Sequence, residues 1–435
     1  MSSPHTAKLP HAAIAALLAD PLLPADFAGL CDCGGRLAGT ESERMALDLV
    51  KQSGHAATGR APTVLPVPYG GWRSDQASLH LLDGGRRIPL QCLPLVRSSG
   101  TAAGGIEAEV VRVGRGTPEE FAALGDTLRG RIALVSHEYM FAAWHIHRRL
   151  KYPAAVEAGA VGFLIAGPLP TRAVAGSSGR GAEAGIPAFG ISPEAAMRLS
   201  PSRGMARVHA ELLTKEWPAQ TETVLFDMPA AGSDGWVVLS AHVDGHEPAE
   251  SAIDNATGVA VALAVARALS PYAKQFRRGL RLAVFSAEEW ALTGSRFYLS
   301  GMPQAERDAI ALNINLDSVG GAGNLTALCS GFPALAAFVR DVSVAAGLPV
   351  GVYLPLMQNS DHANFAAHGI PAMRLVSGFD AVDSNMRHVL TAADTRDKVT
   401  ETELRTAALV AAALTWEALV AAPERIAALR RGRAS

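Results

Sequence analysis

The sequence predicts an α/β protein with a mixed, mostly parallel sheet covered by helices on both faces. After residue 220, near-continuous apolar strands alternate with helices, which is typical of a parallel sheet buried between helical layers. The chain has 435 residues, of which 49% are hydrophobic and 18% are charged. This composition permits a large buried core and excludes global disorder.

The expected elements follow one another regularly along the chain. Thr40 with Glu43 three residues later resembles a capping box and predicts a helix through Val50. Residues 60–115 have the pattern of short strands and turns. After residue 220, strands are expected at 236–240, 280–285, 310–316 and 372–376, and helices at 258–269, 295–300, 334–346 and 401–419.

Residues 96–212 form a distinct block. A turn and strand at 128–135, a helix at 151–158 and a strand at 161–165 predict a small α/β module. We therefore expect three segments: residues 1–95 and 213–435 as the two parts of the larger domain, and residues 96–212 as an insertion.

Charge and cysteine content exclude several classes of protein. The formal net charge of −2 marks no nucleic-acid or acidic-membrane partner. Cys31, Cys33, Cys92 and Cys329 form neither a CxxC pair nor a dense disulfide framework. The apolar run 12–19 is too short to span a bilayer and lacks the features of a secretory signal. A cytoplasmic location without membrane contact is expected.

Polar residues cluster directly after the predicted strands, where the ligand crevice of a parallel sheet lies. They are His242 and Asp244 after the first strand, Asp254-Asn255 before the next helix, Glu288-Glu289 after the second strand and Asp317 after the third. Singly, they also fit a structural histidine, a helix N-cap or a solvated helix start. Together they predict a site for Zn²⁺, with Co²⁺ or Mn²⁺ possible.

In order and spacing, these residues resemble the M28 family of co-catalytic zinc aminopeptidases and their carboxypeptidase relatives. Further matches are Arg36-Leu37-Ala38-Gly39-Thr40, Ser360-Asp361-His362 and Gly369-Ile370-Pro371-Ala372. Residues 96–212 resemble the protease-associated (PA) domain that many M28 members carry. The resemblance implies a zinc exopeptidase-like fold with an inserted PA-like domain.

The resemblance also implies a role for each matched residue. One zinc ion would be bound by His242, Asp317 and one oxygen of Asp254. A second would be bound by the other oxygen of Asp254, by Glu289 and by a late histidine. Asp244 would orient His242, and Glu288 would act as the general base.

The late histidine is the point at which the sequence departs from the family pattern. The family's histidine closely precedes an Asp-Thr pair, here Asp394-Thr395, but Leu390 occupies its usual position. His388 lies two residues earlier and becomes the expected ligand if the loop is longer, with His362 as the alternative. His246, His368, His145 and His147 are expected to be solvated or structural.

The predicted function is a dinuclear zinc exopeptidase that removes N-terminal residues from peptides or splits dipeptides. Alternatives are a metal-dependent hydrolase of non-peptide or N-acyl amides, a glutaminyl cyclase-like mononuclear enzyme, and a non-catalytic receptor-like scaffold. Retention of both Glu288 and Glu289 favours hydrolysis. The expected partner is a small peptide or amide, with a homodimer possible.

Overall fold

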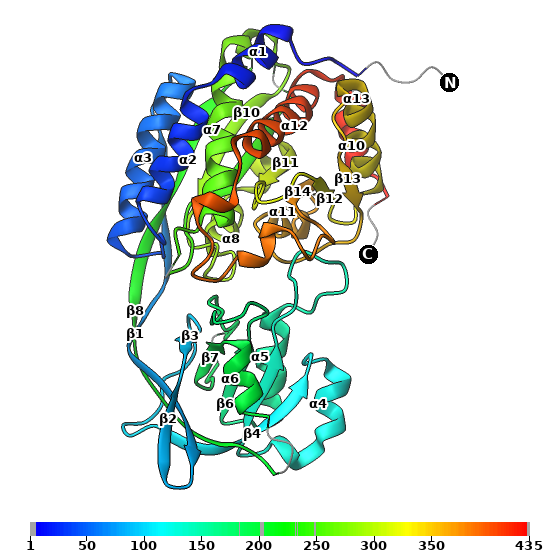
Figure 1. Ribbon diagram of the computed structural model, residues 1–435. Helices are drawn as coiled ribbons and strands as arrows, with labels where there is room; N and C mark the ends of the chain where they lie inside the picture. The colour runs from blue at the N-terminus through cyan, green and yellow to red at the C-terminus, as the bar shows by residue number, and fades with distance from the viewer. Residues whose placement is uncertain are drawn as a thin grey trace. The chain divides into compact units, whose positions relative to one another are not determined.

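The computed structural model describes residues 6–432 except 182, 201–203, 231, 233 and 248. The chain divides into two compact units (Figure 1). Unit 1 comprises Met1–Tyr69, Gln220–Val389 and Asp394–Ser435, and unit 2 comprises Gly70–Ala219 and Leu390–Ala393. The predicted insertion, residues 96–212, lies inside unit 2, whose bounds are wider.

Unit 1 is built on a mixed sheet with the strand order β13-β12-β14-β11-β9-β10-β8. The four strands β14, β11, β9 and β10 are parallel neighbours. β8 runs antiparallel to β10, and β12 runs antiparallel to β14 and parallel to β13. The strand bounds are β8 Arg207–Met228, β9 Trp236–His242, β10 Gly279–Phe285, β11 Ile310–Leu316, β12 Leu325–Leu328, β13 Gly351–Tyr353 and β14 Ala372–Ser377. The predicted fold class is confirmed.

The helices of unit 1 pack around α7, Thr257–Leu269. Of its residues, Arg267 alone is not buried, and a helix that is apolar on all sides belongs in a core. It contacts α1, α2, α3, α12 and β9. The other helix bounds are α1 His11–Ala19, α2 Leu22–Asp32, α3 Glu41–Thr58, α8 Thr293–Ser300, α9 Gln304–Asp308, α10 Pro333–Ala346, α11 His362–Ala367, α12 Glu401–Val420 and α13 Pro423–Ala427.

Short helical turns complete unit 1: η2 Ala252–Ala256, η3 Ser270–Gln275, η4 Asn385–His388, η5 Arg396–Lys398 and η6 Ala428–Arg430. Among the described residues, the stretch Ala252–Gln275 is long and apolar enough to cross a membrane, and 94% of its apolar window is buried inside the protein. The bent pairs α1–α2 and α12 with Pro423–Arg430 pass the same test if each is one span.

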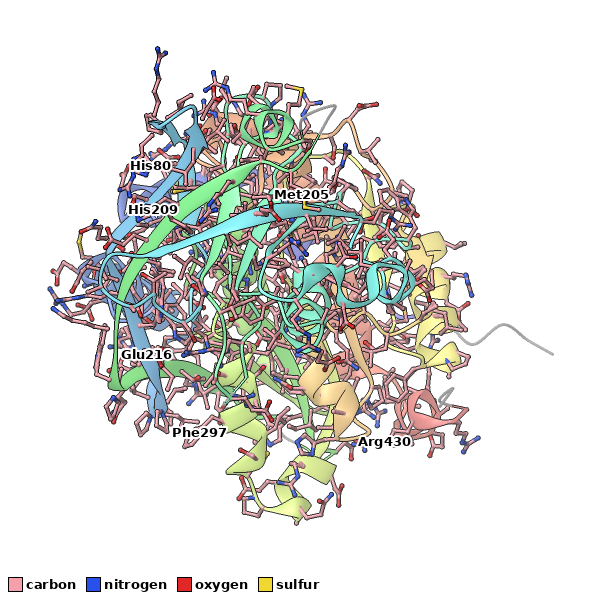
Figure 2. All side chains as sticks on the ribbon, turned by 90° about the horizontal axis from the view of Figure 1, so that it is seen from below. His80, Met205, His209, Glu216, Phe297 and Arg430 are labelled. Carbon is pink, nitrogen blue, oxygen red and sulfur yellow. The ribbon has the colours of Figure 1, made fainter. Side chains whose placement is uncertain are left out.

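Unit 2 has its own sheet and its own apolar core. The first part of β8 pairs with β4, and the order continues β4-β5-β6-β7-β3, with β4 to β7 parallel. β1 pairs with β2 and β8, and His80 of β1 lies beside His209 of β8 with ring centroids 6.2 Å apart (Figure 2). The bounds are β1 Thr63–Asp83, β2 Arg86–Leu90, β3 Cys92–Pro94, β4 Ile106–Gly114, α4 Pro118–Leu124, η1 Gly125–Leu128, β5 Ile132–Ser136, α5 Arg148–Glu157, β6 Gly162–Ala166, β7 Ala188–Ile191 and α6 Pro193–Arg198.

Two local expectations differ from the structure. β1 is one strand of 21 residues rather than a set of short strands, because its pairing with β2 and β8 carries it through its prolines and glycines. The capping box at Thr40 is only half formed. Thr40 accepts from the Glu43 amide at 3.3 Å, but the Glu43 carboxylate accepts from the Gly39 amide and from the hydroxyls of Thr221 and Ser286.

Candidate metal centre

Three neighbouring parallel strands end at the candidate site. β9 lies between β10 and β11, with His242 opposite Phe285 and Ser240 opposite Asn315. His242 is the last residue of β9, and Asp317 directly follows β11. The strands therefore deliver their polar residues to one edge of the sheet, as the ligand-crevice rule for parallel sheets predicts.

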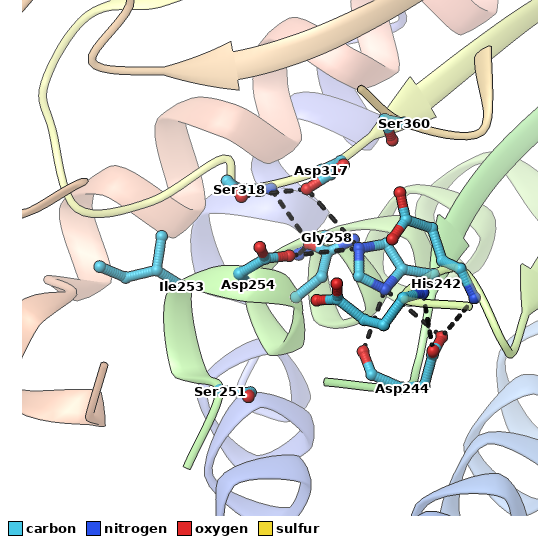
Figure 3. Close-up of polar contacts among 12 residues, drawn as sticks. His242, Asp244, Ser251, Ile253, Asp254, Gly258, Asp317, Ser318 and Ser360 are labelled. Carbon is cyan, nitrogen blue, oxygen red and sulfur yellow. Dashed lines mark hydrogen bonds and ion pairs between the residues drawn. The ribbon is translucent and has the colours of Figure 1, made fainter. Parts of the chain in front are cut away.

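The predicted ligands of the first ion meet at this edge (Figure 3). His242 Nε2 lies 3.2 Å from Asp254 Oδ1 and 3.7 Å from Asp317 Oδ1. His242, Glu288 and Asp317 each offer one ligand atom within 4.8 Å of the others, and all three residues are buried. The sequence prediction that these residues, distant along the chain, converge agrees with this geometry.

Asp244 fixes the backbone of the glutamate pair. Its Oδ1 accepts from the amide of Glu288 and its Oδ2 from the amide of Glu289, both at 3.1 Å. His242 Nδ1 lies 3.0 Å from the Asp244 carbonyl oxygen and 3.6 Å from the Asp244 carboxylate. Asp244 thus orients the histidine through its backbone carbonyl, because its carboxylate lies beyond hydrogen-bond distance of Nδ1.

The loop that carries Asp254 is fixed from both sides. The Asp394 carboxylate accepts from the amides of Ile253 at 2.7 Å and Asp254 at 3.2 Å. Asn255, which follows Asp254 through a cis peptide bond, donates to the Leu316 carbonyl at 2.9 Å and accepts from the amide of Gly258 at 3.0 Å. These bonds hold Asp254 against the end of β11.

Gly258 permits this close approach. A Cβ at this position would lie 2.2 Å from the Leu316 carbonyl oxygen and 2.3 Å from Asn255 Oδ1. Any larger residue would push the first turn of α7 away from β11. The glycine is therefore required by packing beside the site, and it keeps Asp254 within reach of His242.

Arg36 holds the segment between β9 and Asp254. It is fully buried, and its guanidinium donates to five backbone carbonyls. The acceptors are Leu30 at 3.1 Å, Gly34 at 2.9 Å, Val243 at 2.8 Å, Glu250 at 2.6 Å and Ser251 at 2.6 Å. The resemblance to the family segment Arg36-Leu37-Ala38-Gly39-Thr40 implies no role for this arginine, and the structure shows that it ties the N-terminal segment to the site loop.

Several site residues adopt backbone angles that L-residues rarely take. Ser251, Ala287 and Ser318 have φ values of 47°, 55° and 59°. Such conformations persist only when the surroundings impose them, and they cluster at functional sites. Ala287 directly precedes the glutamate pair and Ser318 directly follows Asp317, so the strained positions border the candidate ligands.

The site buries more negative than positive charge. Burial lowers the pKa of His242, but Glu288 and the aspartates around it outweigh burial and raise it well above its ordinary value. Burial, reinforced by Asp317, raises the pKa of Asp254. Burial also acts to raise the pKa of Asp317. Arg374, 3.0 Å away, and His242 outweigh burial and hold this pKa well below its ordinary value.

This donor set suits a divalent cation. A buried imidazole nitrogen converges with several carboxylate oxygens, which is the ligand chemistry of zinc in proteins. Buried carboxylates are costly unless they are paired or coordinate a metal. A cation between His242, Asp254 and Asp317 would offset the excess of acids, so the residues present fit the expected metal.

The other predicted residues have the following surroundings. Glu289 diverges from Glu288, and its Oε2 lies 2.6 Å from Nε2 of His246. His388 is half-buried at the end of η4. His362 is fully buried at the start of α11, and burial, with Arg374 nearby, lowers its pKa to about 3.

Sequence reasoning missed several contributors to the site. Asp361 is buried, and burial raises its pKa to about 7, with His242 acting in the opposite direction. Arg374 on β14 pairs with Asp317. Both residues lie within or near the matched family segments. Their identity alone does not predict which side chains surround them in the folded protein. The alternation His242-x-Asp244-x-His246 is a sequence signal for His246, which the sequence pattern predicts to be solvated or structural.

Comparison with known proteins agrees with this geometry. Residues 223–415 match peptidase family M28, and residues 93–199 match the PA domain. The chain therefore resembles peptidase family M28 in its second half. The M28 match spans His242, Asp254, Glu288, Glu289 and Asp317. The PA match lies within unit 2.

Individual relatives of this chain are distant. Over 157 residues it is 28% identical to leupeptin-inactivating enzyme 1 of Streptomyces exfoliatus, and the aligned region covers 36% of each protein. Over 395 residues it is 25% identical to aminopeptidase YwaD of Bacillus subtilis, covering 89% of this chain and 82% of that protein. The chain thus spans about a third of the first relative and most of the second.

A solved structure shows the same fold. BSAP, a zinc aminopeptidase from Bacillus subtilis, superposes with a TM-score of 0.73 at 22% identity, covering 95% of this chain and 96% of BSAP. At this identity the likeness establishes the architecture.

Proposed function

We propose that the protein is a zinc-dependent exopeptidase of the aminopeptidase type, with two co-catalytic ions. The observation that carries the proposal is the buried convergence of His242, Asp254, Glu288 and Asp317 at the carboxyl edge of the sheet. The match of residues 223–415 to family M28 and the names of the relatives, an aminopeptidase and a zinc aminopeptidase, support it.

The first ion would be held by His242, Asp317 and Asp254. Asp254 would share its second oxygen with another ion held by Glu289 and a histidine. For that histidine the sequence predicts His388, and the structure offers His246, whose Nε2 lies 2.6 Å from Glu289. Bound zinc would polarise the scissile carbonyl and acidify the attacking water.

Glu288 is the proposed general base. Its carboxylate lies among the ligand atoms of His242 and Asp317, and burial raises its pKa well above the ordinary value, opposed by His242 and reinforced by Glu289. A buried carboxylate of this kind can take a proton from the attacking water and return it to the leaving amine. Asp244 positions it through the amide of Glu288.

Metal analysis and a substrate panel test the proposal. Purified full-length protein would be assayed for bound zinc and for cleavage of aminoacyl-anilides, dipeptides and N-acyl amino acids, before and after chelation. We expect two zinc ions and chelator-sensitive release of N-terminal residues. Cleavage restricted to N-acyl amino acids would indicate an amide hydrolase, one ion with glutamine cyclisation a cyclase, and absence of metal a scaffold.

A further inference from the structure

The geometry points to His246 as the nitrogen ligand of the second metal ion, together with Glu289 and Asp254. This inference deepens the proposed function and rests on it. It moves the ligand from the late loop, where the sequence predicts His388, to the segment that directly follows β9. The second site would then be built from the same loop that supplies the first.

The imidazole of His246 is placed to share an ion with Glu289. His246 Nε2 lies 2.6 Å from Glu289 Oε2, and the two side chains are 5% and 8% exposed. Among the described residues, this buried nitrogen has no hydrogen-bond partner of acceptable geometry. The His246 nitrogen and the Glu289 oxygen are both of the types that bind zinc. They therefore face each other in a buried place without the alignment of a hydrogen bond.

The carboxylate of Asp254 is available for sharing. Its Oδ1 lies 3.2 Å from His242 Nε2, and among the described residues this buried oxygen has no hydrogen-bond partner. Asp317 is already paired with Arg374 at 3.0 Å, whereas an ion held by His246 and Glu289 would neutralise the Glu289 carboxylate.

The backbone that presents His246 is held in place by hydrogen bonds. Its amide donates to Ser251 Oγ at 2.9 Å, and the same hydroxyl donates to the His246 carbonyl at 3.1 Å. The carbonyl of Ser251 accepts from Arg36 at 2.6 Å. A Cβ on Gly35 would lie 2.9 Å from the His246 carbonyl oxygen. A ligand must be held in place by its neighbours to bind metal tightly, and these contacts supply that support.

The test uses full-length protein stripped of metal and titrated with Zn²⁺ against a chromophoric chelator. The variants are His246→Ala, His388→Ala and His362→Ala, with the exposed His11→Ala as a matched control. We expect His246→Ala to keep one tight zinc and to bind the second at least roughly 100-fold more weakly, since even supporting residues around a ligand are worth 10–100-fold. The other three variants should bind two zinc ions as the wild type does.

A cobalt spectrum gives a readout independent of activity. A thiolate bound to Co²⁺ produces a charge-transfer band, and cysteine is a ligand that zinc-type sites accept. We expect the band in cobalt-loaded His246→Cys and its absence from the wild type, whose four cysteines are Cys31, Cys33, Cys92 and Cys329. Thermal unfolding of the metal-free variants reports whether they fold.

The outcomes separate the two proposals. Two tightly bound zinc ions in His246→Ala, or no cobalt–thiolate band in folded His246→Cys, overturn the assignment of His246 and leave the peptidase proposal standing. Loss of the second ion only in His388→Ala does the same and restores the sequence prediction. Wild-type protein without zinc overturns both.

Discussion

Replacing Arg36 by methionine tests whether this side chain fixes the site loop. Methionine retains the length and apolar stem but removes the five hydrogen bonds to backbone carbonyls. Three of the acceptors, in Leu30, Val243 and Ser251, lie in bonds that are fully buried. A buried acceptor left without a partner costs about 1–3 kcal/mol, so the three together cost about 3–9 kcal/mol.

Relief of the buried charge reduces this loss. Burial lowers the pKa of Arg36, which means that the folded protein bears a cost for keeping the guanidinium charged, and methionine removes that cost. We therefore expect the lower part of the range, about 3 kcal/mol. For a unit of this size such a loss lowers the melting temperature by about 6–12 °C.

Scanning calorimetry of metal-free, full-length protein measures the effect. Arg44→Gln is the matched control, because Arg44 is an exposed arginine nearby that pairs with Glu41 on the surface of α3, and we expect no measurable change there. Arg36→Met should also bind zinc more weakly than the wild type, since the loop it loosens ends at Asp254. A melting temperature and zinc affinity equal to those of the control would refute the reasoning.

Three further predictions concern the proposed base, the shared ligand and unit 2. Glu288→Gln should retain its zinc content while turnover falls by about 10²–10⁴-fold, and an equal loss of metal would contradict the role of base. Asp254→Ala should lose both ions, and metal analysis that finds two would rule out the bridging position. The stability of unit 2 should fall as pH drops from about 6.5 to about 4. The reason is that burial, with Lys151 nearby, lowers the pKa of His145 to about 4 in the folded unit. Between these pH values the imidazole takes up a proton in the unfolded chain but not in the folded unit. Hydrogen exchange of the β5 and β6 amides, corrected for intrinsic rates, measures this stability at each pH. The stability should decline less steeply with falling pH in His145→Gln, and an unchanged slope would remove His145 as the cause.

Much of the architecture was predictable because its signals are local. The strand 310–316 and the helix 258–269 are apolar runs bounded by turns, and the structure places β11 at Ile310–Leu316 and α7 at Thr257–Leu269. The length of β1 was not predictable, since it depends on pairing with strands distant in sequence. The cytoplasmic location and the homodimer stay predictions.

The sequence by itself determined the residue types of the site and the edge at which they meet, because parallel strands bring their carboxyl ends together whatever the details of packing. His242 and Asp317 follow from that rule, whereas Asp254 belongs to the segment that joins β9 to α7. The contacts between segments were decided only by the tertiary structure: Arg36 on the loop after β9, Asp394 on the amide of Asp254, and His246 against Glu289. Their physical reason is that a side chain's partners across the chain depend on loop paths and burial, and neither is encoded in the spacing of residues along one segment.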